Sequence, residues 1–191
     1  WYLGTKTKKG SSTDTGWTAS FESERTAGVS GSAYNGLEQK MRRTKMAQIY
    51  LASPFFSEEQ ITRIEMVEKA LTNNPTVADF YSPRKHQEAE NEEFTKPWAK
   101  EIYQRDIENI EAADAVLAVI DFEGPNVDSG TAYEIGAAVA MGKPVVVFQQ
   151  KGNTVNLMIS ESLHAYLKTG EEVENYDFKK MPTSEYNGDL I

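Results

Sequence analysis

The segment that most restricts the fold is residues 115–120 (AVLAVI), an uninterrupted apolar run. Such a run is typical of a strand buried on both faces, as in a parallel sheet covered by helices. Parallel strands need a crossover between them, so helices must alternate with strands along the chain. The pattern therefore predicts an α/β fold of the Rossmann-like or flavodoxin-like type, with helices on both faces of one parallel sheet.

The chain from Met46 onward follows this alternation. Further strands are expected at 48–53, 76–82 and 145–148, and helices at about 57–73, 97–113, 129–141 and 156–167, followed by an irregular tail. Ser57 and Gln60 form a capping-box pattern at the first helix, and Gly142 is placed to end the third. Ligands of such sheets bind beyond the carboxyl ends of the strands. The loops at 53–56, 82–96 and 121–128 are therefore the expected location of a site.

Residues 1–45 differ from the rest of the chain. They are rich in Gly, Ser and Thr, lack helical or strand periodicity and carry a net charge of +4, whereas residues 46–191 carry −13. We expect a disordered N-terminal segment over 1–45 and a single domain over 46–191. Two arginine codons can spell a purine-rich ribosome-binding sequence, and Arg42 and Arg43 lie at a suitable distance before Met46. We therefore hypothesise that residues 1–45 are translated upstream sequence and that Met46 is the natural start. A genuine flexible arm is the alternative.

The composition excludes several kinds of site. The chain has no cysteine and only two histidines, His86 and His164, so thiol catalysis is excluded and neither a multi-histidine metal site nor a histidine-based triad is expected. We interpret His86 as solvated and His164 as structural. The net charge of −9 argues against nucleic acid or an anionic membrane as partner. We expect a cytoplasmic protein whose ligands are small molecules.

Two carboxylates stand where a structural helix would carry apolar residues. Glu134 is the only charged residue in 129–141, a helix predicted to be buried all round because its small and apolar residues point in every direction. A buried carboxylate is destabilising unless it is paired, although the helix dipole favours its ionised form. Asp106 falls between Ile102 and Ile110 on the apolar arc of its own helix. Both are candidate site residues; the alternatives are a solvated Glu134 and an Asp106 that lies on the surface or caps a neighbouring backbone.

Asp128 and Tyr50 should lie near the same edge of the sheet. Asp128 precedes the Glu134 helix, where Asp is also a preferred N-cap, and Tyr50 belongs to the first strand. Two or three carboxylates with a tyrosine suit glycosyl chemistry. In that chemistry one carboxylate attacks the anomeric carbon and another manages the proton of the leaving group.

Four segments resemble, in the same order, motifs of the nucleoside 2-deoxyribosyltransferases. They are 49–56 (IYLASPFF), 103–106 (YQRD), 128–136 (DSGTAYEIG) and 156–158 (NLM). The resemblance covers roughly residues 46–182. It implies an enzyme of nucleoside salvage that transfers the 2-deoxyribosyl group of a 2′-deoxynucleoside between free purine or pyrimidine bases. It also implies a homo-oligomer, a hexamer built as a trimer of dimers, and no cofactor.

The resemblance assigns roles residue by residue. Glu134 would form a covalent 2-deoxyribosyl ester, Tyr50 would orient it, and one of Asp106 and Asp128 would handle the base proton. The remaining implied substrate-binding residues are Phe55, Gln87, Gly130, Asn156, Met158 and Tyr186. Asn156 and Met158 would complete the site of a neighbouring subunit. Tyr186 would stand in for the aromatic residue that often ends chains of this family; the alternative is that the 5′ end of the sugar is held differently.

Two other functions stay open at this point. A 2′-deoxynucleoside 5′-monophosphate N-glycosidase would share the fold and the glutamate, but it needs phosphate-binding groups, usually Gly- and Arg-rich, beside the first strand. This chain has residues 53–56 (SPFF) there. The second is a catalytically silent nucleoside-binding module, against which Glu134, Asp106 and Asp128 argue.

Overall fold

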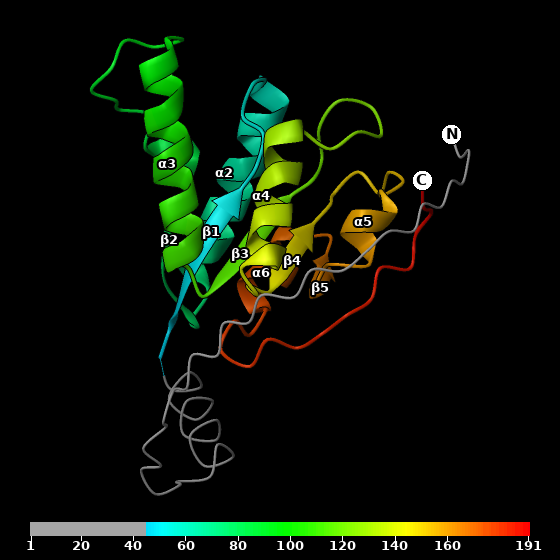
Figure 1. Cartoon of the computed structure of the whole chain (residues 1–191). Coiled ribbons are helices and arrows are strands. Elements are labelled where there is room, and N and C mark those ends of the chain that lie inside the picture. The colour runs from blue at the N-terminus through cyan, green and yellow to red at the C-terminus, as the bar shows by residue number, and fades with distance from the viewer. Residues whose placement is uncertain (1–44) are drawn as a thin grey trace, which may run out of the picture.

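The computed structural model describes residues 45–191, whose centre is a five-stranded parallel sheet (Figure 1). The disorder expected for the N-terminal segment concerns residues outside this range, apart from Lys45. The strands are β1 (Ala47–Ala52), β2 (Val77–Tyr81), β3 (Ala115–Val119), β4 (Val145–Phe148) and β5 (Ala165–Leu167). Their order is β2-β1-β3-β4-β5, and all neighbouring pairs are parallel. This is the flavodoxin-like order, which confirms the predicted fold class.

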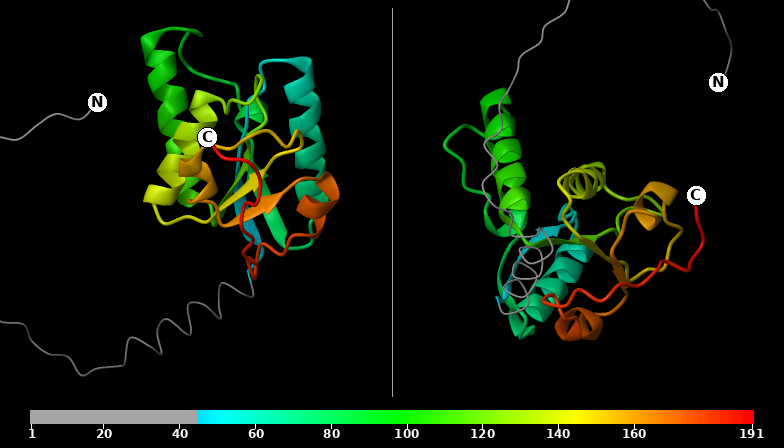
Figure 2. Two further views of the ribbon diagram at one scale, coloured as in Figure 1. Left: turned by 90° about the vertical axis from the view of Figure 1, so that its right-hand side faces the viewer. Right: turned by 60° about the horizontal axis from the view of Figure 1, so that its bottom comes forward.

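Helices cover both faces of the sheet (Figure 2). They are α2 (Glu58–Asn73), α3 (Lys96–Ala112), α4 (Ser129–Ala140), α5 (Leu157–Ser160) and α6 (Gly170–Asn175), with a 3₁₀ turn η1 (Pro83–Lys85). One apolar core joins α2 and α6 to side chains such as Leu51 and Leu117. The other joins α3, α4 and α5 to Tyr50 and Val116. Because side chains alternate along a strand, Tyr50 faces the α3 and α4 side.

The sequence signals that begin and end these helices are confirmed. Ser57 is the N-cap as expected, and its hydroxyl accepts the Gln60 amide N–H. The reciprocal half of the capping box differs, because the Gln60 side chain accepts the amide N–H of Phe56 at 2.8 Å rather than that of Ser57. The expected stop signal of α4 is also present: this helix ends before Gly142, which has φ +71°. A side chain would be strained in this left-handed conformation, which explains the glycine.

Three expectations about the second half of the chain are wrong. Instead of one helix over 156–167, the structure has the short helix α5 and the edge strand β5, and it places α6 in the tail expected to be irregular. Short apolar runs fit either a helix or a strand, and pairing with β4 decides for the strand at 165–167. α4 is not buried all round either: Tyr133, Val139 and Met141 are 54%, 39% and 40% exposed, because only one side of α4 packs on the sheet.

Among the helices of the described range, none is long and apolar enough to cross a membrane.

Candidate active site

A pocket of about 390 Å³ opens at the carboxyl edge of the sheet, between α3 and α4. Its size is within the range of small-molecule sites. Four acidic side chains line it, together with a larger apolar wall. The acidic residues are Glu93, Asp106, Asp128 and Glu134, and the aromatic ones include Phe55, Phe56, Phe94 and Trp98. The structure thus brings together Asp106, Asp128 and Glu134, the three carboxylates that the sequence nominated from two separate segments.

Glu134 is paired with Tyr50 at the inner end of this pocket. The fully buried Tyr50 donates its hydroxyl hydrogen to Glu134 Oε1. The pKa of Glu134 is raised to about 7, chiefly by burial and to a smaller extent by the charges of Asp106 and Asp128, while the Tyr50 hydrogen bond acts in the opposite direction. Burial outweighs the helix-dipole effect expected from the sequence. Burial and the nearby Glu134 charge also raise the pKa of Tyr50 far above its usual value, so this residue stays a neutral donor.

Asp106 is held by a tyrosine that the sequence reading did not single out. Tyr81, the β2 partner of Tyr50 in the sheet register, donates its hydroxyl to Asp106 Oδ1 at 3.2 Å. The Tyr81 ring stacks between Tyr50 at 5.7 Å and His86 at 4.5 Å. Burial raises the pKa of Asp106. One continuous aromatic stack therefore carries the groups that hold both carboxylates. His86 ends this stack and remains exposed to solvent, as interpreted from the sequence.

Asp128 caps α4 and lines the pocket at the same time. Its Oδ2 accepts the backbone N–H of Thr131 at 2.9 Å, as expected for an N-cap. The absence of a side chain at Gly130 leaves room for this carboxylate, because a Cβ at residue 130 would crowd Asp128 Oδ2 at only 3.0 Å. Phe55 also lines the pocket, stacked on Phe56 with ring centroids 5.4 Å apart.

The loop after β2 presents Gln87 to the pocket and is anchored from α3. Arg105 donates to the carbonyl oxygens of His86 at 2.6 Å and Glu88 at 2.5 Å. The Gln87 side chain itself donates to the Pro83 carbonyl at 2.5 Å. Arg105 thus fixes the backbone on both sides of Gln87. Sequence reasoning missed it because its position next to Asp106 gives no hint of a partner so far away along the chain.

The carboxylates of the pocket are not arranged as metal ligands. Across residues 45–191, no group of three or more His, Asp or Glu side chains has the geometry to hold a metal ion. What the pocket does offer is a buried carboxylate held by a phenol, with a second and third carboxylate beside it. In chemical terms, such an arrangement can supply a nucleophile with nearby proton carriers.

Comparison with known proteins agrees with this geometry. The family model for nucleoside 2-deoxyribosyltransferase matches residues 49–179. A curated nucleoside deoxyribosyltransferase from Limosilactobacillus fermentum is 30% identical over 144 residues, covering 69% of this chain and 84% of the relative. The chain belongs to the nucleoside 2-deoxyribosyltransferase family.

A solved member of this family has the same fold. It is a 2-deoxyribosyltransferase from the psychrotolerant bacterium Bacillus psychrosaccharolyticus, 40% identical, with a TM-score of 0.67. The match covers 74% of this chain and all of the other. As a member of this family the chain is an enzyme of the pentosyltransferase type.

Three residues implied by the family resemblance do not line the pocket of their own chain. Asn156 caps α5 by accepting the Met158 backbone N–H at 2.9 Å, and the Met158 side chain is 73% exposed. Tyr186 packs edge-on against Tyr166 at 5.0 Å. Backbone hydrogen bonds of Val155 with Asp189 and Ile191 hold the C-terminal segment in place. The substrate-binding role implied for Tyr186 stays a prediction.

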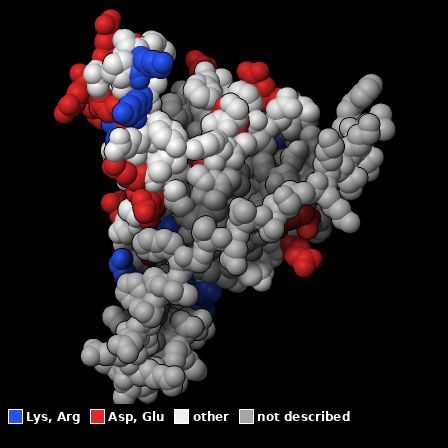
Figure 3. All heavy atoms as spheres, viewed as in Figure 1, with Lys and Arg blue, Asp and Glu red and all other residues white. Residues whose placement is uncertain are grey.

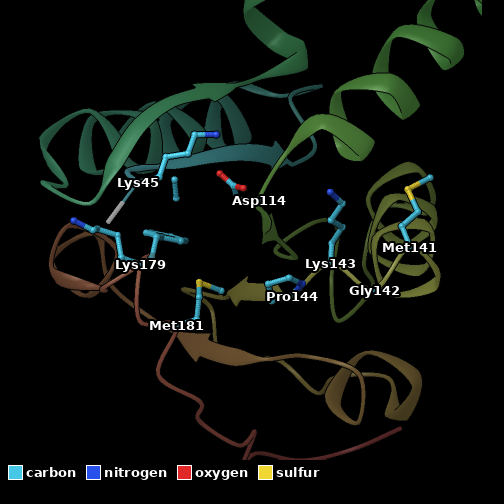
Figure 4. Close-up of a pocket in the computed structure, with 10 residues that line it drawn as sticks. Lys45, Asp114, Met141, Gly142, Lys143, Pro144, Lys179 and Met181 are labelled. Atoms are coloured by element: carbon cyan, nitrogen blue, oxygen red, sulfur yellow. The ribbon is translucent and has the colours of Figure 1, made fainter. Parts of the chain in front are cut away.

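A second pocket lies at the opposite edge of the sheet (Figure 4), with a volume of about 230 Å³. Lys45, Lys143, Lys179 and Asp114 contribute its charged groups. Lys143 is committed to the carbonyl oxygens of Glu111 and Ala113 at the end of α3, where a cation offsets the helix dipole. This pocket holds no pair of carboxylates and lies far from the Glu134 edge, so it is not the site of glycosyl chemistry.

Proposed function

We propose that the enzyme transfers the 2-deoxyribosyl group of a 2′-deoxynucleoside from one purine or pyrimidine base to another through a covalent ester on Glu134. The observation that carries this proposal is the Tyr50–Glu134 pair, placed in one pocket with Asp106 and Asp128. No metal or organic cofactor enters the proposed reaction.

In the first half-reaction the Glu134 carboxylate attacks C1′ as the bond from C1′ to the base nitrogen breaks. The bonding electron pair leaves with the base, which takes a proton from Asp106 or Asp128. The transition state resembles an oxocarbenium ion, as in retaining glycosidases. Burial raises the pKa of Asp106, which makes this carboxyl easier to protonate than a free aspartate. Tyr50 orients Glu134 and stabilises its ionised form.

The second half-reaction reverses these steps with a new base. A nitrogen of the incoming base attacks C1′, the ester bond breaks, and its electron pair returns to the Glu134 carboxylate. The proton lost by the base returns to the same aspartate. Two displacements at C1′ give net retention of configuration, and the kinetics are expected to be ping-pong.

The charge around the pocket supports a neutral nucleoside rather than a 5′-monophosphate. Acidic side chains gather over the outer end of α3 and the loop before it, beside some Lys or Arg side chains (Figure 3); the loop contains Glu88, Glu90, Glu92 and Glu93. Both terminal nitrogens of Arg105, which lines the pocket, are already used by loop carbonyls. A 5′-phosphate would be repelled by these carboxylates, and Arg105 would have no free pair of N–H groups with which to bind it.

The proposal includes a homo-oligomer, a hexamer built as a trimer of dimers. The exposed apolar residues of α4 and the exposed Leu157 and Met158 of α5 support it, because such surface is usually covered in an assembly. In this assembly Asn156 and Met158 would reach a neighbouring subunit's site. The cytoplasmic location expected from the sequence stays a prediction.

Product analysis tests the proposed reaction. The full chain is incubated with 2′-deoxyinosine and adenine, then with thymidine and adenine, and the products are separated by chromatography. New 2′-deoxyadenosine is the expected product, and Glu134→Ala should abolish it while the thermal unfolding transition is kept. Free hypoxanthine or thymine without a new nucleoside would indicate hydrolysis. The assay would then be repeated with 2′-deoxynucleoside 5′-monophosphates to test for the N-glycosidase. Nucleoside binding without turnover would indicate the silent module.

A further inference from the structure

Two tyrosines of neighbouring strands stand side by side behind the pocket carboxylates. Tyr50 of β1 and Tyr81 of β2 are partners in the sheet register, and their rings stack with centroids 5.7 Å apart and planes inclined by 20°. Each hydroxyl donates to one carboxylate, Tyr50 to Glu134 and Tyr81 to Asp106. These carboxylates belong to different helices, α4 and α3. The pair of tyrosines therefore ties both helices to one place on the sheet.

The Tyr81 ring is held on both faces. Tyr50 covers one face, and the His86 ring covers the other at 4.5 Å with an inclination of 17°. His86 is itself fixed, because its Nδ1 donates to the Ser82 carbonyl oxygen at 3.0 Å and its own carbonyl accepts from Arg105. The hydroxyl of Tyr81 consequently has a defined position relative to that of Tyr50.

The sheet sets the spacing of the two carboxylates through these hydroxyls. Neighbouring strands lie about 4.8 Å apart, and the stacked rings are separated by a similar distance. In retaining glycosidases the nucleophile and the acid are about 5–5.5 Å apart. The charge of Asp106 raises the pKa of Glu134, which agrees with so close an approach. The tyrosine pair thus favours the separation that two displacements at one carbon require.

Asp106 is the aspartate better suited to carry the base proton. Asp128 accepts two hydrogen bonds from Thr131 as the cap of α4, and such bonds favour a carboxylate. Asp106 accepts one bond, at Oδ1, and its Oδ2 has no hydrogen-bond partner within residues 45–191. Since Oδ1 is occupied by the Tyr81 hydrogen, a proton on Asp106 is carried by Oδ2.

We propose that Tyr81 is a positioning residue of the reaction, which aims Asp106 at the departing base. Tyr81 is not among the residues that line the pocket, whereas Asp106 is, so Tyr81 acts on the substrate only through Asp106. As the bond from C1′ to the base breaks, its electron pair leaves with the base. The proton on Asp106 Oδ2 passes to the base, and Asp106 is left as a carboxylate. This inference rests on the base-exchange function proposed above.

Removing the Tyr81 hydroxyl has two opposite effects. Its hydrogen bond favours the ionised form of Asp106, so the loss of that bond alone makes Asp106 easier to protonate and would speed the departure of the base. Loss of orientation slows it, because a general acid contributes about 10²- to 10⁴-fold only when it is correctly placed. A slower Tyr81→Phe enzyme therefore reports positioning rather than a change in acidity.

The test compares two donors that differ in their need for a proton. The base of 7-methyl-2′-deoxyguanosine already carries a positive charge and leaves as a neutral molecule, whereas the base of 2′-deoxyguanosine must be protonated. With adenine as acceptor, kcat/KM is measured for each donor from the 2′-deoxyadenosine formed. Tyr81→Phe should lower it about tenfold for 2′-deoxyguanosine and less than twofold for the methylated donor.

The matched control is Tyr176→Phe. It also removes a tyrosine hydroxyl, one that donates to the Pro182 carbonyl at 2.8 Å, from the core on the other face of the sheet. Both rates should stay as in the wild type. Equal losses on the two donors, or a faster Tyr81→Phe enzyme, would overturn the positioning role while leaving base exchange intact. A wild type that forms no new nucleoside from either donor would refute base exchange and this role with it.

Two substitutes keep the test decisive. If the wild type transfers from 2′-deoxyguanosine but not from its methylated form, 2′-deoxyuridine and 5-fluoro-2′-deoxyuridine replace the pair, because fluorine makes uracil a better leaving group. The loss in Tyr81→Phe should then be smaller for the fluorinated donor, and equal losses would contradict the role. If Tyr81→Phe lacks the wild-type unfolding transition, His86→Ala decides, since it frees one face of the Tyr81 ring. It should slow 2′-deoxyguanosine more than the methylated donor, and equal rates of loss would count against the proposal.

Discussion

Removing the Tyr50 hydroxyl should move the pH dependence of the enzyme upward. In the proposed mechanism Glu134 must be ionised, so activity rises with pH through its pKa of about 7. The Tyr50 hydrogen bond stabilises the ionised form and lowers this pKa against the effect of burial. A hydrogen bond to a charged group contributes about 1.5–3 kcal/mol, and one pKa unit corresponds to about 1.4 kcal/mol. Tyr50→Phe should therefore raise the pKa of Glu134 by about one to two units.

The consequence is a loss of activity that depends on pH. At pH 7 the ionised fraction of Glu134, and with it kcat/KM, should fall about 5- to 50-fold, while at pH 9.5 the two enzymes should differ by about twofold or less. The assay is the rate of 2′-deoxyadenosine formation from 2′-deoxyinosine and adenine between pH 5.5 and 9.5. Tyr176→Phe removes a half-buried hydroxyl that is bonded to the Pro182 carbonyl, and should leave the profile unchanged. An acid limb that stays in place or moves down in Tyr50→Phe would refute the reasoning.

Three further changes follow from particular contacts. Glu134→Gln should increase the free energy of unfolding by up to about 3 kcal/mol at pH 8.5 and leave it unchanged at pH 4, because a carboxyl whose pKa is raised from 4.5 to about 7 destabilises the fold only when ionised. Urea unfolding at the two pH values checks this, and a less stable variant at pH 8.5 would contradict it. Arg105→Gln should raise the KM of the acceptor base about tenfold and change kcat little, since it releases the backbone on both sides of Gln87; a loss confined to kcat in steady-state assays would argue against that role. Glu68→Ala should lower stability by about 3 kcal/mol, because it leaves Arg84 and the buried Ser82 hydroxyl without their shared partner. An unfolding midpoint equal to that of the wild type would show that this network is not stabilising.

The candidate site was only partly accessible from the sequence. Glu134 and Asp106 could be nominated because a charge on an otherwise apolar helical stretch is expensive to bury, and this signal is local. Tyr81, His86, Arg105 and Trp98 carry no such local signal. Tyr81 is an ordinary strand residue until the register with β1 places it on Tyr50 and opposite Asp106.

The sequence by itself determined the fold class and most element boundaries, because strand and helix periodicity, N-caps and the glycine at 142 act over a few neighbouring residues. It failed at 156–175, where α5, β5 and α6 are too short for a period to be recognised. The capping box of α6, formed by Thr169 and Glu172, was a readable signal that was missed. Only the tertiary structure decided that 165–167 pairs with β4 and that one side of α4 stays exposed. It also fixed the pKa of Glu134, because pairing, exposure and burial depend on residues brought together from distant parts of the chain.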